Sequence, residues 1–208
     1  MKKIFIVSGL ILIMLVLLLI GCAKGKNENV SEVLESDTDN ENISELDSLG
    51  DVEVDKGLFS VEITVPSEYV ENKTQEELTA LAEENGYKSI TLNEDGSATY
   101  VMTKSQHNKM MSEMKKTIDS SIQEMIGSED YPSFTDIQHN DDYTEFTVTT
   151  AHASLDLAES FSTMAFYMYG GMYAIFNGSE VDNIHVIFVN SENGEIVSEA
   201  NSNELNNN

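Results

Sequence analysis

The sequence predicts an α+β fold, in which about three β-hairpins form an antiparallel sheet and two or three helices pack on one face. Three observations predict it: short runs in which apolar and polar residues alternate, turn sequences centred near residues 95, 141 and 193, and long amphipathic segments between those turns. Hairpin-linked strands give antiparallel sheets with one solvated face, so the helices are expected on the other face.

The first elements expected are a strand and a helix. The stretch LFSVEITV (58–65) alternates apolar and polar residues, which predicts a half-buried strand that ends before Pro66. The stretch TQEELTALAEENG (74–86) opens on Thr74 and Glu77, the pair that forms a capping box, and it closes on a glycine. This second stretch is therefore expected to be a helix.

Hairpins and helices are then expected to follow in turn. Asp-Gly and Asn-Gly pairs between alternating runs are strong signals for tight hairpin turns. Apolar residues spaced by three and four predict the helices between them. Tyr143 is expected to be an ordinary strand residue of the second hairpin. The predicted order is hairpin 88–102, helix 104–126, hairpin 134–151, helix 155–176 and hairpin 183–200.

The start of the chain has the features of an export signal. Two lysines precede the uncharged apolar segment 4–20, as in a secretory signal peptide. The next residues, Leu19-Ile20-Gly21-Cys22, resemble the lipobox of bacterial lipoproteins. The resemblance implies that 1–21 is a signal peptide and that Cys22 carries a diacylglycerol, whose two acyl chains anchor stably. The alternative is an uncleaved membrane anchor beside an incidental cysteine.

The remaining boundaries follow from composition. Residues 22–56 are acidic and rich in Asn and Ser, which predicts a disordered tether. A single domain is expected over 57–200, followed by a disordered tail over 201–208. The net charge of -26 excludes nucleic-acid binding through phosphates, and it leaves the bilayer, reached through the lipid, as the expected partner.

No motif in the sequence indicates catalysis, and no catalytic residue, resident metal or cofactor is predicted. The domain has no cysteine, and the four histidines lack His-Glu-x-x-His spacing. His107, Met111 and Met114 share one helical face and offer ligands that suit Cu(I). The same stripe continues into Ile118 and Ile122, so core packing is the favoured interpretation.

The segment FSTMAFYMYGGMYAIF (161–176) is apolar nearly all round, which predicts a buried helix. Its glycine pair costs ~1 kcal/mol per residue relative to alanine and therefore has a reason. Close approach to the sheet, or a kink, is the favoured reason. The functional alternative is a ligand groove lined by Tyr167, Tyr169, Gly170, Gly171, Met172 and Tyr173.

With its lipobox, its acidic tether and the motifs LNEDGSATYVMT and YGGMYAIF, the chain resembles a group of uncharacterised lipoproteins of clostridia. The resemblance implies a place on the outer face of the cell membrane, and the group brings no established activity with it. The expected function is a non-enzymatic binding or accessory domain held at the membrane. The alternatives are an extracytoplasmic hydrolase that uses carboxylates and a copper-handling lipoprotein.

Overall fold

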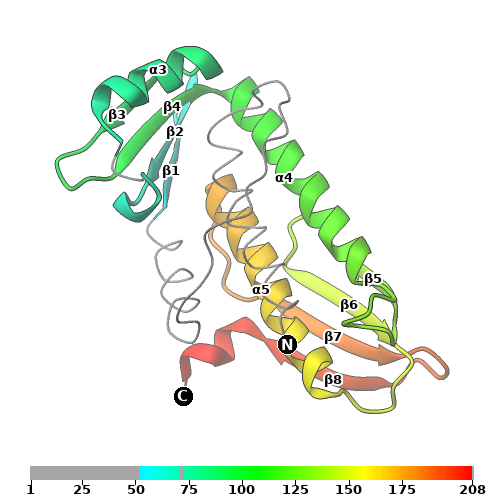
Figure 1. The fold of residues 1–208 in the computed structure, drawn as a ribbon. Coiled ribbons are helices and arrows are strands. Elements are labelled where there is room, and N and C mark those ends of the chain that lie inside the picture. The colour runs from blue at the N-terminus through cyan, green and yellow to red at the C-terminus, as the bar shows by residue number, and fades with distance from the viewer. Residues whose placement is uncertain (1–51, 71–72, 208) are drawn as a thin grey trace, which may run out of the picture. The chain divides into compact units, whose positions relative to one another are not determined.

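The structure is a computed structural model that describes residues 52–70 and 73–207. Within these residues the chain forms three α-helices and two four-stranded sheets, which confirms the α+β class (Figure 1). The described residues divide into two compact units, 52–108 and 109–207, where one domain was expected. Each unit has its own sheet, so each is described by itself.

The first unit is an antiparallel sheet with one helix against it. It comprises β1 (Glu53–Lys56), β2 (Ser60–Val65), the short 3₁₀-helix η1 (Ser67–Tyr69), α3 (Gln75–Asn85), β3 (Ser89–Leu92) and β4 (Ala98–Thr103). The strand order is β1-β2-β4-β3, and α3 lies against β3. Alternate residues of β2 and β4 are buried, as the alternating pattern predicts.

The predicted limits of α3 are confirmed by its caps. The Thr74 hydroxyl accepts the Glu77 amide, and the Glu77 carboxylate accepts the Thr74 amide at 2.7 Å. The amide side chain of Gln75 then ties the helix to β3, because it donates to the Ile90 carbonyl at 2.9 Å and accepts from the Leu92 amide at 2.8 Å. This side chain covers backbone groups on the outer edge of the sheet.

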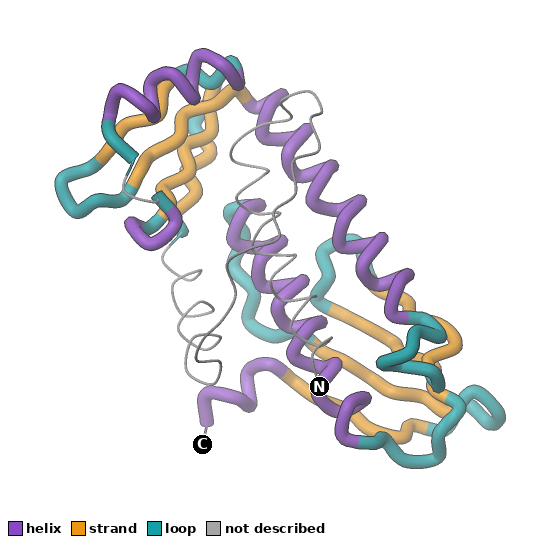
Figure 2. The backbone as a smooth tube through the Cα atoms, viewed as in Figure 1, coloured by secondary structure: helices purple, strands orange, loops and turns teal. Residues whose placement is uncertain are grey.

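The second unit is a mixed sheet covered by helices. It comprises α4 (Lys104–Met125) from Lys109 onward, β5 (Phe134–His139), β6 (Glu145–Thr150), α5 (Leu157–Asn177), β7 (His185–Asn190), β8 (Ile196–Asn201) and the 3₁₀-helix η2 (Ser202–Asn207). The strand order is β5-β6-β7-β8, with β6 and β7 parallel and the outer pairs antiparallel (Figures 1 and 2).

Helix α5 is the crossover that makes the parallel pair possible, because parallel neighbours cannot be joined by a tight turn. It packs on the sheet through aromatic rings, with Phe146 of β6 and Phe166 of α5 separated by 4.8 Å between ring centroids. Helix α4 lies beside α5, since the Lys115 ammonium is 5.4 Å from the Tyr173 ring centroid. The core of this unit therefore lies between one sheet face and two helices.

The prediction of a single antiparallel sheet is wrong. The three hairpins do form, with β3–β4, β5–β6 and β7–β8 as the pairs. The first hairpin pairs with β2, whereas the other two pair with each other through parallel strands. A turn sequence fixes pairing within a hairpin, and it carries no information on how one hairpin meets the next.

Two expected boundaries also differ from the structure. Strand β1 lies inside the predicted tether 22–56, of which residues 22–51 are outside the described residues. This strand lies at the sheet edge and has no fully buried side chain. It therefore needs few apolar residues, and its amino-acid composition resembles that of a disordered tether. In the expected tail, the Ser202 hydroxyl accepts the Ile184 amide at 2.7 Å, which ties η2 to the start of β7.

Across residues 52–70 and 73–207, none of the helices combines the length and the apolar character that crossing a bilayer requires.

Candidate functional site

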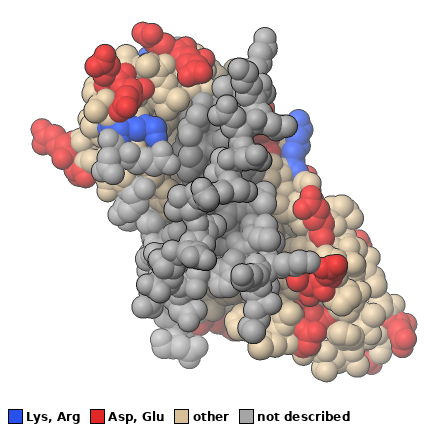
Figure 3. Space-filling model, in the orientation of Figure 1, with Lys and Arg blue, Asp and Glu red and all other residues tan. Residues whose placement is uncertain are grey.

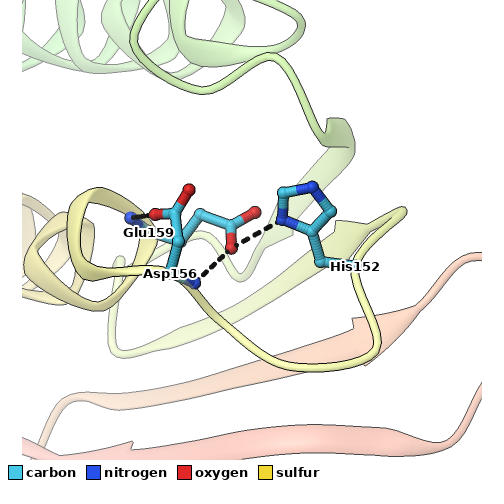
Figure 4. A group of neighbouring side chains, drawn as sticks. All are labelled: His152, Asp156 and Glu159. Carbon is cyan, nitrogen blue, oxygen red and sulfur yellow. Dashed lines mark hydrogen bonds and ion pairs between the residues drawn. The ribbon is translucent and has the colours of Figure 1, made fainter.

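The N-terminus of α5 brings His152, Asp156 and Glu159 together (Figure 4). The helix begins here because Asp156 and Glu159 form a capping box. The Asp156 carboxylate accepts the Glu159 amide at 2.9 Å, and the Glu159 carboxylate accepts the Asp156 amide at 2.8 Å. This Asp-x-x-Glu pair is readable in the sequence, but the chemistry around it is not.

Glu159 is a buried carboxylate with a full set of donors. Only 1% of its side chain is exposed. The hydroxyls of Ser133 and Thr150 donate to Oε1, the latter at 3.1 Å, while the Asp156 amide and His152 Nδ1 face Oε2 at 2.8 and 3.1 Å. A carboxylate has about four lone-pair sites, so these four groups occupy all of them. The site is satisfied as it stands.

These donors decide the charge of Glu159. Burial raises its pKa, but the hydrogen bonds from Ser133, the Asp156 amide, His152 and Thr150 outweigh burial and bring the pKa below the usual value of 4.5. The group is therefore ionised at neutral pH, and its donors stabilise the charged form.

Because the pKa of Glu159 is lower in the folded chain than in the unfolded chain, the free energy of unfolding depends on pH. The stabilisation from Glu159 is complete above the unfolded-state pKa near 4.5, and it is lost as pH falls through the lower folded-state value. We therefore expect Glu159→Gln to be destabilising at pH 7, with a difference from the wild type that shrinks as the pH falls below 4.5. Urea unfolding of both chains across this range measures it. A difference that stays constant or grows would contradict the assignment of this pKa.

The three side chains also have the composition of a metal site, since one ligand atom from each lies within 4.8 Å of the others. The hydrogen bonds argue for a different role. Both Glu159 oxygens and His152 Nδ1 are already engaged with each other or with neighbours. A cation would have to replace these bonds, so the cluster suits a buried cap that holds the 151–156 loop to α5.

One outward group remains in this cluster. His152 has 48% of its side chain exposed, and a neutral ring that donates Nδ1–H to Glu159 presents Nε2 as an acceptor. Within residues 52–70 and 73–207, no hydrogen bond joins this nitrogen to a serine or threonine hydroxyl. The pair therefore has a histidine and its orienting carboxylate, but the third group of a hydrolytic triad is not found in that part of the chain.

The six residues of the predicted groove all lie on α5, and most of them are core. Tyr169, Gly170, Met172 and Tyr173 are buried, while Tyr167 and Gly171 are half-buried. Burial raises the pKa of Tyr169 to about 12, against a smaller lowering by Ser121. Among the residues that the structure describes, its hydroxyl has no hydrogen-bond partner. This burial supports the core interpretation of the segment.

Close packing explains the first glycine of the pair. A Cβ on Gly170 would fall well inside van der Waals contact of the Tyr143 carbonyl oxygen and 2.9 Å from Ile184 Cδ1. A Cβ on Gly171 would meet no atom of the described residues within 4 Å, apart from the backbone of its own helix. The favoured reason, close approach of the helix, therefore holds for Gly170, and its partner is the turn before β6.

Tyr143 was expected to be an ordinary strand residue, and this prediction is wrong, because it lies between β5 and β6. It is a turn residue with φ of 56°, unusual for a side chain of its size, and it is 1% exposed. Its hydroxyl donates to Asp119 of α4 at 2.6 Å, and the His139 ring stacks on it at 4.6 Å. Burial, and then the bond to Asp119, raise its pKa well above 10.0. The interactions of Tyr143 fasten the second hairpin to α4, and no local sequence signal predicts them.

The structure also shows where most of the other residues singled out in the sequence lie. His107, Met111 and Met114 are each buried, as the core alternative to a copper site predicts. His185 contacts Glu199 at 2.8 Å across the β7–β8 pair. Cys22, the predicted lipidation site, lies outside the described residues.

The chain was also compared with known proteins. Neither a protein-family model, nor a curated protein, nor a solved structure matches it.

Proposed function

We propose that the chain is a lipoprotein, anchored by a diacylglycerol on Cys22 to the outer face of the cell membrane, whose folded part binds a partner and catalyses no reaction. The observation that carries the anchoring is the order of the first residues. Two lysines, the uncharged segment 4–20 and the Leu19-Ile20-Gly21-Cys22 motif follow one another at the spacing of a lipoprotein signal. Two acyl chains suffice for stable attachment to a bilayer.

The polar cluster around Glu159 lacks the properties that acid–base catalysis needs. A general acid needs a raised carboxyl pKa, whereas that of Glu159 is lowered. A general base needs a free lone pair, whereas four donors surround this carboxylate. The geometry at the start of α5 therefore argues against Glu159 as the acid or base of a carboxylate-dependent hydrolase, and the non-enzymatic binding role remains our proposal.

The anchoring is tested on the chain produced in a Gram-positive host. Mass spectrometry of the wild type is expected to find Cys22 as the first residue, carrying a diacylglycerol. The Cys22→Ala chain is expected to keep residues 1–21 and to carry no acyl group, because the thiol is the attachment point. Wild-type protein that retains residues 1–21 with an unmodified thiol would overturn the proposal.

A further inference from the structure

Helix α5 has a second apolar face, which the sequence interpretation assigned to the core. Leu157, Phe161 and Met164 are 74%, 61% and 42% exposed. Their spacing of four and three places them in one line along the helix. The buried side chains of α5, including Phe166 and Tyr169, account for its packing in the unit, so these three, named here the exposed stripe, are not needed for that core. Aligned exposed apolar residues of this size mark interaction sites more often than isolated ones do.

The charge around the exposed stripe selects the kind of partner. After Lys116 the chain contains no Lys or Arg, while acidic residues continue as far as Glu204. Asp156 is exposed and adjoins Leu157 at one end of the stripe. Glu204, in η2, is also exposed. An acidic group thus adjoins the Leu157 end of the stripe, and no Lys or Arg follows Lys116 in the sequence.

Acidic surface is not confined to this helix. On the face drawn in Figure 3, acidic side chains are spread over the described surface and basic ones occupy only a few places. A second copy of this chain would bring the same charge to the stripe, and an anionic bilayer would do likewise, so both are disfavoured by repulsion. A basic partner gains attraction from the same groups.

We propose that the exposed stripe binds a basic amphipathic helix of another protein. Apolar residues of that helix, spaced by three and four, would contact Leu157, Phe161 and Met164, and its Lys or Arg residues would be attracted to Asp156 and to the acidic surface around it. This inference deepens the proposed binding function and rests on it, and it does not depend on lipidation of Cys22. Phe161 lies in the middle of the stripe and has the largest side chain of the three, so it is the expected anchor.

The test uses the full chain in phosphatidylcholine nanodiscs, which carry no net charge. The probe is a fluorescent Leu/Lys peptide of about 18 residues with Leu at helical spacing. Two peptides serve as references: one of the same composition in scrambled order, and one with Glu in place of Lys. We expect the amphipathic basic peptide to bind most tightly, and its affinity to fall between ~50 and ~500 mM salt.

Matched variants locate the binding. Phe161→Ser is expected to weaken binding by about tenfold or more. Ile196→Ser removes another exposed apolar side chain, 62% exposed on β8, and is expected to leave the affinity unchanged. Both positions are on the surface, so the variants should fold, which thermal unfolding checks.

Three results would overturn the proposal. Equal binding of the scrambled peptide, or equal loss in the two variants, would reduce the effect to general charge attraction. Light scattering that shows wild-type dimers and monomeric Phe161→Ser would assign the stripe to a second copy. Protection of α5 amides by the nanodisc alone, lost in Phe161→Ser, would assign it to the bilayer. None of these bears on the mass of the Cys22 peptide, so failure here is distinct from failure of the anchoring.

Discussion

Gly170→Ala is expected to lower the free energy of unfolding by about 3 kcal/mol or more. The added methyl group would overlap the Tyr143 carbonyl oxygen and press on Ile184. The carbonyl belongs to the backbone, and Tyr143 is held in place by its bond to Asp119 and by its positive φ, so it has little freedom to move. The cost therefore exceeds the ~1 kcal/mol that alanine gains over glycine in a helix.

The neighbouring glycine provides the control. Gly171→Ala adds the same methyl group on the same helix, where no atom of another described element lies within 4 Å, so we expect stabilisation of up to ~1 kcal/mol. Urea unfolding of the full chain, followed by tyrosine fluorescence, measures both. Equal effects at the two positions would show that helix propensity, and not the approach to Tyr143, governs this pair.

Glu159→Ala is expected to cost about 3–5 kcal/mol. The change leaves the buried hydroxyls of Ser133 and Thr150 without their acceptor and also removes the partner of the Asp156 amide. Each buried donor left unpaired costs ~1–3 kcal/mol, and loss of the cap adds ~1 kcal/mol. The same unfolding measurement applies.

The other capping box of the chain is the matched control. Glu77 makes the equivalent bonds at the start of α3, but it does so in solvent. Water replaces the lost acceptor there, so Glu77→Ala is expected to cost much less than Glu159→Ala. Similar losses in the two variants would mean that burial adds nothing to the first box, contrary to the geometry around Glu159.

The comparison of these two boxes shows how far sequence alone reaches. Thr74-x-x-Glu77 was predicted as a cap and is confirmed as one. Asp156-x-x-Glu159 has the same spacing, yet its importance comes from Ser133 and Thr150, which reach it from the segment before β5 and from the end of β6. No periodicity or motif near residue 159 carries that information.

The face assignments of the long helices show a similar limit. The buried line of α4, from Met111 through Ile118 to Met125, follows from spacing and is confirmed by burial. Helix α5 is apolar nearly all round, so its pattern does not separate Phe166, which is buried, from Phe161, which is exposed. Only the position of the sheet and of α4 decides between them.

Alternation, helical spacing and turn chemistry act over a few residues, so they were enough to predict the α+β class, the three hairpins, the order of the helices and the cap of α3. Long-range packing set the other features: the division into two sheets, the parallel pairing of β6 with β7, the contact of Gly170 with Tyr143 and the burial of Glu159. These features join segments that are distant in the chain, where packing and backbone pairing between whole elements determine which groups meet.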